Sequence, residues 1–171
     1  MIKKGNVLIF LARLAEVYPI GHVKKAPGTF ASFISLFIGY YLINLLGIFN
    51  FIIFLIIFSI IGFIISEIHV RVFKQKDPKE VVIDEVIGQS IPIYLYEIAH
   101  GAVKESPDVI LFYLYIFILF RFFDIKKPFP INYFDKNFKN SFGVIFDDVI
   151  AGFYVVITLI IFMVFKSKLF T

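Results

Sequence analysis

The chain has 171 residues, of which 60% are hydrophobic and 24 are phenylalanine, and its formal net charge is +4. One soluble domain of this length could not bury so much apolar side chain, so the composition indicates an integral membrane protein, with a single membrane domain over residues 1–171. The absence of cysteine excludes disulfides, thiolate metal sites and phosphatase chemistry with a cysteine nucleophile.

The first predicted element is a short helix over residues 7–18. It is too short to cross roughly 30 Å of hydrocarbon, so we place it in the membrane interface. Pro27 and Gly28 then interrupt the helical pattern, and Thr29 is a candidate cap for the next helix. That helix is predicted over residues 30–46 and is uncharged.

A tight turn at residues 47–50 leads to a second apolar run at residues 51–65, so the two runs predict a hairpin of membrane spans. A charged, water-exposed loop with a helical start follows at residues 66–85. A third run, at residues 86–99, contains a proline and a glutamate. This interruption indicates either a short span or a broken one.

A polar connector at residues 100–108 leads to a fourth apolar run at residues 109–123. Residues 124–142, with two prolines and several aromatic and lysine residues, fit an amphipathic loop in the headgroup region. A fifth run is predicted over residues 149–165. The sequence therefore predicts an all-α, polytopic membrane protein with four to five membrane-spanning helices and a short N-terminal interfacial helix.

The basic residues predict the orientation of the chain. If all five runs cross the membrane, the loops at residues 18–30, 66–85 and 121–148 lie on one side. The positive-inside rule makes this side cytoplasmic, because most of the lysines and arginines lie there. The fourteen on this side are Lys3, Lys4, Arg13, Lys24, Lys25, Arg71, Lys74, Lys76, Lys79, Arg121, Lys126, Lys127, Lys136 and Lys139, and the three opposite are Lys104, Lys166 and Lys168.

Three acidic stretches lie against the ends of apolar runs on the predicted cytoplasmic side. An ionised carboxylate at a membrane boundary costs free energy unless a cation or water compensates it. Complementing the dipole of the following helix is one explanation, but five carboxylates on one face favour a shared divalent-cation site. Mg²⁺ suits such a set of oxygen ligands. The five residues are Asp84, Glu85, Asp124, Asp147 and Asp148.

Basic residues beside these stretches indicate phosphate binding. Two prolines stiffen the loop after Lys127 and would hold Lys127 and Arg121 near the carboxylates. The backbone N–H groups of Gly28 and Thr29 could form an anion cradle, and a plain turn with a helix cap is the alternative.

Other polar residues have less specific patterns. Glu67 is a candidate for a further ligand. His22, His69 and His100 have no partner at a characteristic spacing. We interpret these three histidines as ordinary polar loop residues.

Four blocks of the sequence, taken in order, resemble the phosphatidylglycerophosphatase A family of bacterial phospholipid synthesis. The blocks cover most of the chain. They are Pro27-Gly28-Thr29, then Asp84-Glu85 with Gly88, then Arg121 through Asp124, Lys127-Pro128, Pro130 and Asp135, and finally Gly143 through Asp147-Asp148 to Gly152.

The resemblance implies Mg²⁺-dependent removal of the terminal phosphate from phosphatidylglycerophosphate in the bilayer, at the cytoplasmic face of the bacterial inner membrane, with no nucleic-acid partner. The implied metal ligands are Asp84, Glu85, Asp124, Asp147 and Asp148. The implied catalytic residues are Asp84, Asp124, Asp148, Arg121 and Lys127. The implied substrate-binding residues are Gly28, Thr29, Arg121 and Lys127.

The residues leave the nucleophile open, because an aspartate can activate water or attack phosphorus itself, and we favour water. Two other classes of function remain open from the sequence. A divalent-cation transporter should place carboxylates at mid-span, where Glu97 is the one candidate. A non-catalytic membrane partner protein would explain the hydrophobicity and not the clustered acids.

Overall fold

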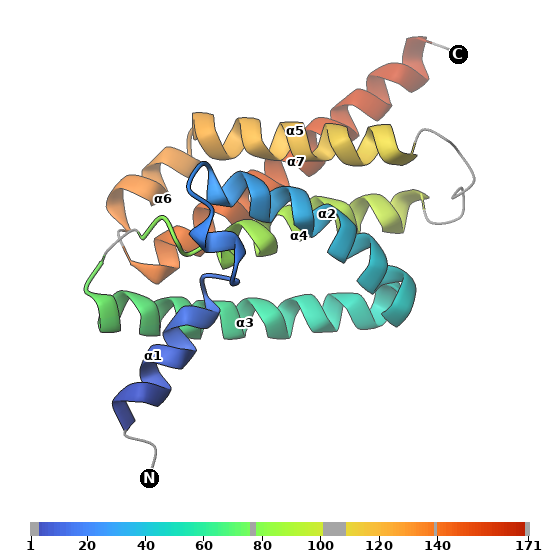
Figure 1. Cartoon of the computed structure of the whole chain (residues 1–171). Helices are drawn as coiled ribbons and strands as arrows, with labels where there is room; N and C mark the ends of the chain where they lie inside the picture. Colours follow the sequence, from blue (N-terminus) through green and yellow to red (C-terminus); the bar gives the residue numbers. More distant parts are fainter. Residues whose placement is uncertain (1–3, 76–77, 101–108, 139, 170–171) are drawn as a thin grey trace.

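The computed structural model describes residues 4–75, 78–100, 109–138 and 140–169, and within these ranges every regular element is a helix. α4 lies at the centre of the bundle and packs most extensively against α7 and α2 (Figure 1). The elements are α1 (Lys4–Leu14), a 3-10 turn η1 (Ile20–His22), α2 (Pro27–Leu46), α3 (Ile48–Phe73), α4 (Ile83–His100), α5 (Val109–Lys126), α6 (Ile131–Asn137) and α7 (Ser141–Leu169).

Three helices of the described chain are long and apolar enough to cross a membrane, by length and composition: α2, α3 and the Ser141–Phe165 part of α7. α4 and α5 have 18 residues each and carry three charged residues each. Their length of roughly 27 Å is close to the hydrocarbon thickness of about 30 Å. The predicted all-α fold and short N-terminal helix are confirmed, and the number of spans stays a prediction.

Several helices extend beyond their apolar runs. α3 continues to Phe73 through the start of the predicted loop, α4 begins at Ile83 instead of residue 86, and α7 begins at Ser141 instead of residue 149. Hydropathy marks the apolar runs, but a helix needs only backbone hydrogen bonds to continue. The acidic pairs therefore lie inside helices, in the first turn of α4 and two turns into α7, and do not precede them as predicted.

Other boundaries differ as well, since α2 begins at Pro27 and not at residue 30, with Ala26 and not Thr29 at its N-cap. α1 ends at Leu14 and not at residue 18, and the predicted amphipathic loop at residues 124–142 contains α6. The connector after His100, at residues 101–108, lies outside the described residues, as do Lys3, Lys76, Lys104 and Lys139.

Two apolar clusters hold the bundle together. The larger one joins α2, α3, α4, α5 and α7 and includes the fully buried Phe120, Ile93 and Ile116. The smaller one surrounds Ile83 and Ile87 of α4. It packs the acidic end of α4 against the chain after α1, α3 and α7, so the position of that end is fixed by buried side chains.

α4 and α7 approach each other so closely that only glycine fits at two positions. A Cβ on Gly152 would lie 2.5 Å from the carbonyl oxygen of Gly88, and a Cβ on Gly88 would lie 2.6 Å from the carbonyl oxygen of Asp148. Pro92 has no N–H to donate to the Gly88 carbonyl, yet α4 continues through it as an unbroken helix. The backbone contact brings the acidic turns of the two helices together.

Replacing Gly152 by alanine should lower the thermal unfolding midpoint of the detergent-solubilised protein, because the new Cβ would push α7 away from α4. Overpacking of this kind costs about 1–3 kcal/mol. Gly5→Ala is the control, since a Cβ at Gly5 meets nothing within 4 Å. Equal midpoints for Gly152→Ala and the wild type would contradict the close approach.

Candidate active site

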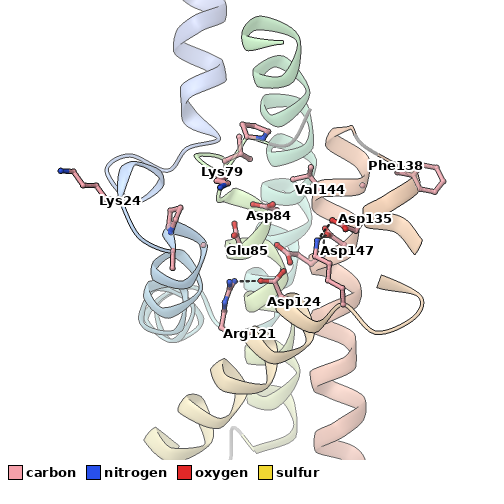
Figure 2. A pocket seen from close by; sticks show the side chains of 18 residues that line it. Lys24, Lys79, Asp84, Glu85, Arg121, Asp124, Asp135, Phe138, Val144 and Asp147 are labelled. Carbon is pink, nitrogen blue, oxygen red and sulfur yellow. Dashed lines mark hydrogen bonds and ion pairs between the residues drawn. The ribbon is translucent and has the colours of Figure 1, made fainter. Parts of the chain in front are cut away.

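A cavity of about 720 Å³ lies where the N-terminal ends of α2, α4 and α7 meet the C-terminal end of α5 (Figure 2). All three acidic stretches of the sequence contribute to it. Its ionisable lining consists of six carboxylates and four cations, which are Asp84, Glu85, Asp124, Asp135, Asp147, Asp148, Lys24, Lys79, Arg121 and Lys127.

Three of the carboxylates form a cluster that could hold a metal ion. One oxygen of each of Asp84, Glu85 and Asp148 lies within 4.8 Å of the others. Asp84 and Asp148 are buried, and Oδ1 of Asp84 and Oε2 of Glu85 have no hydrogen-bond partner among the described residues. Buried carboxylate oxygens without a partner are costly unless a cation compensates them.

The electrostatics of the cluster agree with its geometry. Burial, followed by the adjacent Glu85 carboxylate, raises the pKa of Asp84 well above its ordinary value. Burial also raises the pKa of Glu85. Both residues precede the apolar part of α4 and lie outside the three candidate spans. Crowded negative charge favours either a bound proton or a bound cation at this point.

The other carboxylates in the cavity are paired with cations. Arg121 forms an ion pair of 2.6 Å with Asp124 and also donates a hydrogen bond to the Ser32 hydroxyl at 3.3 Å. Successive residues on a helix point about 100° apart. Asp147 therefore points in a different direction from its neighbour Asp148 and is paired with Lys127 at 2.6 Å.

Lys127 is held between two carboxylates. Its Nζ lies 2.5 Å from Asp135 and 2.6 Å from Asp147. Burial alone would lower the pKa of Lys127, but the two carboxylates raise it above its ordinary value, so the ammonium stays charged. Pro128 disfavours a helical residue before it, which is why α5 ends at Lys126 and the chain turns here.

Of the two residues predicted to form an anion cradle, Gly28 and Thr29, only Gly28 lines the cavity. Gly28 packs directly against Glu85, because a Cβ on Gly28 would lie 1.8 Å from Oε1 of that carboxylate. Thr29 is not part of the lining, and its N–H donates to the carbonyl of Ala26 at 3.0 Å. Glu67 lies outside the lining as well and is bonded to Arg71 and Ser141.

The interpretation of the histidines as ordinary loop residues is wrong: His69 and His100 belong to α3 and α4, and His22 contacts Glu16. His69 is buried in α3, and its Nε2 lies 3.1 Å from the Glu16 carboxylate, which also contacts His22 at 2.7 Å. Glu16 and His69 are 53 residues apart. No local pattern could have revealed the contact. Sequence reasoning also missed Asp135, although Asp135 lies within the third block.

A family model and one relative that covers nearly the whole chain indicate the same family. A sequence model described as Phosphatidylglycerophosphatase A matches residues 13–163. A phosphatidylglycerophosphatase A of Haemophilus influenzae is 34% identical over 156 residues, which cover 91% of this chain and 90% of that protein. A putative phosphatidylinositol-3-phosphatase of Bacteroides thetaiotaomicron is 39% identical over 79 residues, 46% of this chain and 45% of that protein. No solved structure matches the chain significantly.

In excess chelator, and at a pH high enough to ionise the carboxyls of the cluster, Asp84→Asn should raise the thermal unfolding midpoint of the detergent-solubilised protein. The substitution removes one of the crowded charges and supplies an amide N–H that a neighbouring carboxylate accepts. We expect a gain of about 1–3 kcal/mol, the cost of a buried polar group without a partner.

Asp135→Asn is the matched control for this experiment. Asp135 is paired with Lys127, so its replacement should leave the midpoint unchanged or lower it. If Asp84→Asn were less stable than the wild type in chelator, the carboxylates of the cluster would not repel one another.

Proposed function

The chain belongs to the phosphatidylglycerophosphatase A family and removes the terminal phosphate of phosphatidylglycerophosphate, and on this premise we propose that Mg²⁺ held by Asp84, Glu85 and Asp148 assists the reaction. The observation that carries the proposal is the cluster itself. Its three carboxylates come from two helices, and two of its buried oxygens have no partner among the described residues.

The donor set fits this metal. Mg²⁺ binds hard oxygen ligands at about 2.0–2.1 Å and keeps several waters, so a few carboxylates suffice. When bound, the ion would supply Lewis-acid stabilisation of the phosphoryl oxygens. Asp84, Glu85 and Asp148 would hold it, while the cations of the cavity act on the substrate.

Arg121 and Lys127 are the groups proposed to bind the terminal phosphate. Their ion pairs with Asp124 and with Asp135 and Asp147 hold both cations in the cavity, and both would neutralise charge that develops on the transferring phosphoryl group. We therefore propose that Asp124 orients Arg121 and that Asp147 orients Lys127. In the reaction, the bond between phosphorus and the glycerol oxygen breaks, the oxygen of a water molecule forms the new bond to phosphorus, and a proton of that water ends on the glycerol oxygen.

The transport alternative receives no support from Glu97. This residue is buried near the other end of α4, where it accepts a hydrogen bond of 2.8 Å from the Tyr113 hydroxyl. Thirteen residues of helix, roughly 20 Å, separate Glu97 from Asp84. Glu97 is therefore too far from the acidic cluster to act as the next cation-binding site of a transport path through the bundle.

Asp84→Asn, Asp124→Asn and Asp148→Asn should each lower kcat at least about a hundredfold, about 3 kcal/mol in the barrier, because each removes a charge that holds the metal or a phosphate-binding cation. Wild-type activity should vanish in excess chelator and return with Mg²⁺. The measurement is phosphate released from phosphatidylglycerophosphate in mixed micelles, at matched protein levels.

Glu80→Gln is the control, because Glu80 precedes α4 near the acidic pair but does not line the cavity. It should keep near wild-type turnover. Full wild-type activity in excess chelator would rule out the metal site. An equal loss in Glu80→Gln would point to folding and not to the cavity.

We also propose that the cavity opens to the cytoplasm. The chain is a membrane protein with apolar helices, and most of its basic residues belong to the segments on the cavity side. The turn between α2 and α3 would then lie on the opposite side.

Labelling of single cysteines tests this orientation, since the chain has no cysteine of its own. Asn50 and Lys136 are exposed residues at opposite ends of the bundle. In intact spheroplasts, a membrane-impermeant maleimide should label Asn50→Cys at once and Lys136→Cys only after lysis. The reverse pattern would place the cavity outside the cytoplasm, and equal labelling would mean that α2 does not cross.

A further inference from the structure

The cavity has two cationic side chains that the proposed hydrolysis does not use. Lys24 and Lys79 line it and are exposed, and neither has a carboxylate within ion-pair distance among the residues that the structure describes. Arg121 and Lys127, in contrast, are both paired. The positive charges of Lys24 and Lys79 are therefore available to an external anion.

Lys79 belongs to a turn whose C-terminal side is held by buried residues and backbone hydrogen bonds. Val81 and Val82 are buried; the Val81 N–H donates to the carbonyl of Pro78 at 3.1 Å, and the Val82 N–H donates to the carbonyl of Ala15 at 3.1 Å. Figure 2 shows Lys79 next to Asp84, on the side of the carboxylates away from Asp147. The turn thus presents one lysine at the edge of the acidic cluster.

The segment that leads to Lys24 is attached to the same region. Gly21 packs against both neighbouring backbones, because a Cβ there would lie 2.1 Å from the Glu80 carbonyl oxygen and 2.4 Å from that of Glu16. The contacts of the Glu16 carboxylate with His22 and His69 fasten this segment to α3. Lys24 itself extends outward at the edge of the cavity in Figure 2.

The substrate of the proposed reaction carries two phosphates. The terminal monoester is cleaved, and the phosphodiester between glycerol and diacylglycerol remains in the product. A cavity of about 720 Å³ is in the range of small-molecule sites and has room for more than one phosphate. Arg121 and Lys127 are ion-paired beside the acidic cluster, whereas Lys24 and Lys79 at its edge have no ion-pair partner in the described part of the chain, so the cavity offers a phosphate two different environments.

We propose that Lys79, assisted by Lys24, binds the phosphodiester of the lipid head group and thereby positions the terminal phosphate at the acidic cluster. The inference rests on the proposed function, since it assigns the remaining part of the same substrate. Lysine suits this role because its ammonium binds phosphate as a mobile point charge on a flexible stem. Both residues are positioning residues, since neither touches the reacting atoms.

The test uses phosphatidylglycerol, which keeps the diester and lacks the monoester. A fluorescent acyl-labelled phosphatidylglycerol is titrated into wild type and Lys79→Ala in uncharged detergent micelles. Lys79→Ala should raise its Kd roughly tenfold, the loss expected for one charge-assisted hydrogen bond. The KM for phosphatidylglycerophosphate should rise in parallel, with kcat and inhibition by inorganic phosphate near wild type. Lys24→Ala should shift Kd in the same direction.

Two variants serve as controls. Lys126→Ala removes the same charge from an exposed lysine outside the cavity and should leave Kd unchanged. Lys79→Arg should keep most of the affinity, because it keeps the positive charge.

An unchanged Kd in Lys79→Ala would overturn the inference, and so would a loss of kcat at constant KM, which would assign Lys79 to the monoester. If the wild type did not hydrolyse phosphatidylglycerophosphate with Mg²⁺, the proposed function would fail, while the Kd would still decide the role of Lys79.

Discussion

The backbone contact between α4 and α7 is the constraint on which the cavity depends. Gly88 and Gly152 allow the two helices to meet without intervening side chains. As a result, the first turn of α4 and the second turn of α7 bring buried carboxylates within a few ångströms of one another. Their mutual repulsion opposes this arrangement, and the apolar packing around Ile83 and Ile87 offsets it. The fold thus uses hydrophobic contact to hold charges where they would not gather by themselves.

Charge pairing then divides the cavity into regions with different chemistry. Arg121 and Lys127 are positioned by carboxylates of their own and keep their positive charge beside the cluster. The cluster of Asp84, Glu85 and Asp148 has no ion-pair partner among the described residues and so suits a metal ion. A phosphate ester needs both kinds of neighbour, because its oxygens must be neutralised from more than one direction.

The sequence predicts that the acidic stretches lie on one face of the membrane. An even number of predicted spans separates them along the chain, so the chain returns to the same side each time. Sequence reasoning could not place the ends of the helices, because hydropathy reports contact with lipid and α7 begins eight residues before its apolar run. Pro92 indicated a short or broken helix, but α4 continues through it, because a proline inside a helix need not end that helix. The contact between Glu16 and His69 could not be predicted either, because the two residues are distant in sequence and only the fold brings them together.

The attachment of the N-terminal segment has a consequence for the order of biosynthesis. Glu16 and Gly21 leave the ribosome early, but His69 and the Glu80 carbonyl, against which they pack, are made later. Asp148 and Gly152 follow later still. A nascent chain that stops before α7 already contains α2 and α3, yet its Asp84 and Glu85 have no third carboxylate and its α4 has no partner at Gly88. Because domains assemble as their segments emerge, the cavity can form only in a nearly complete chain.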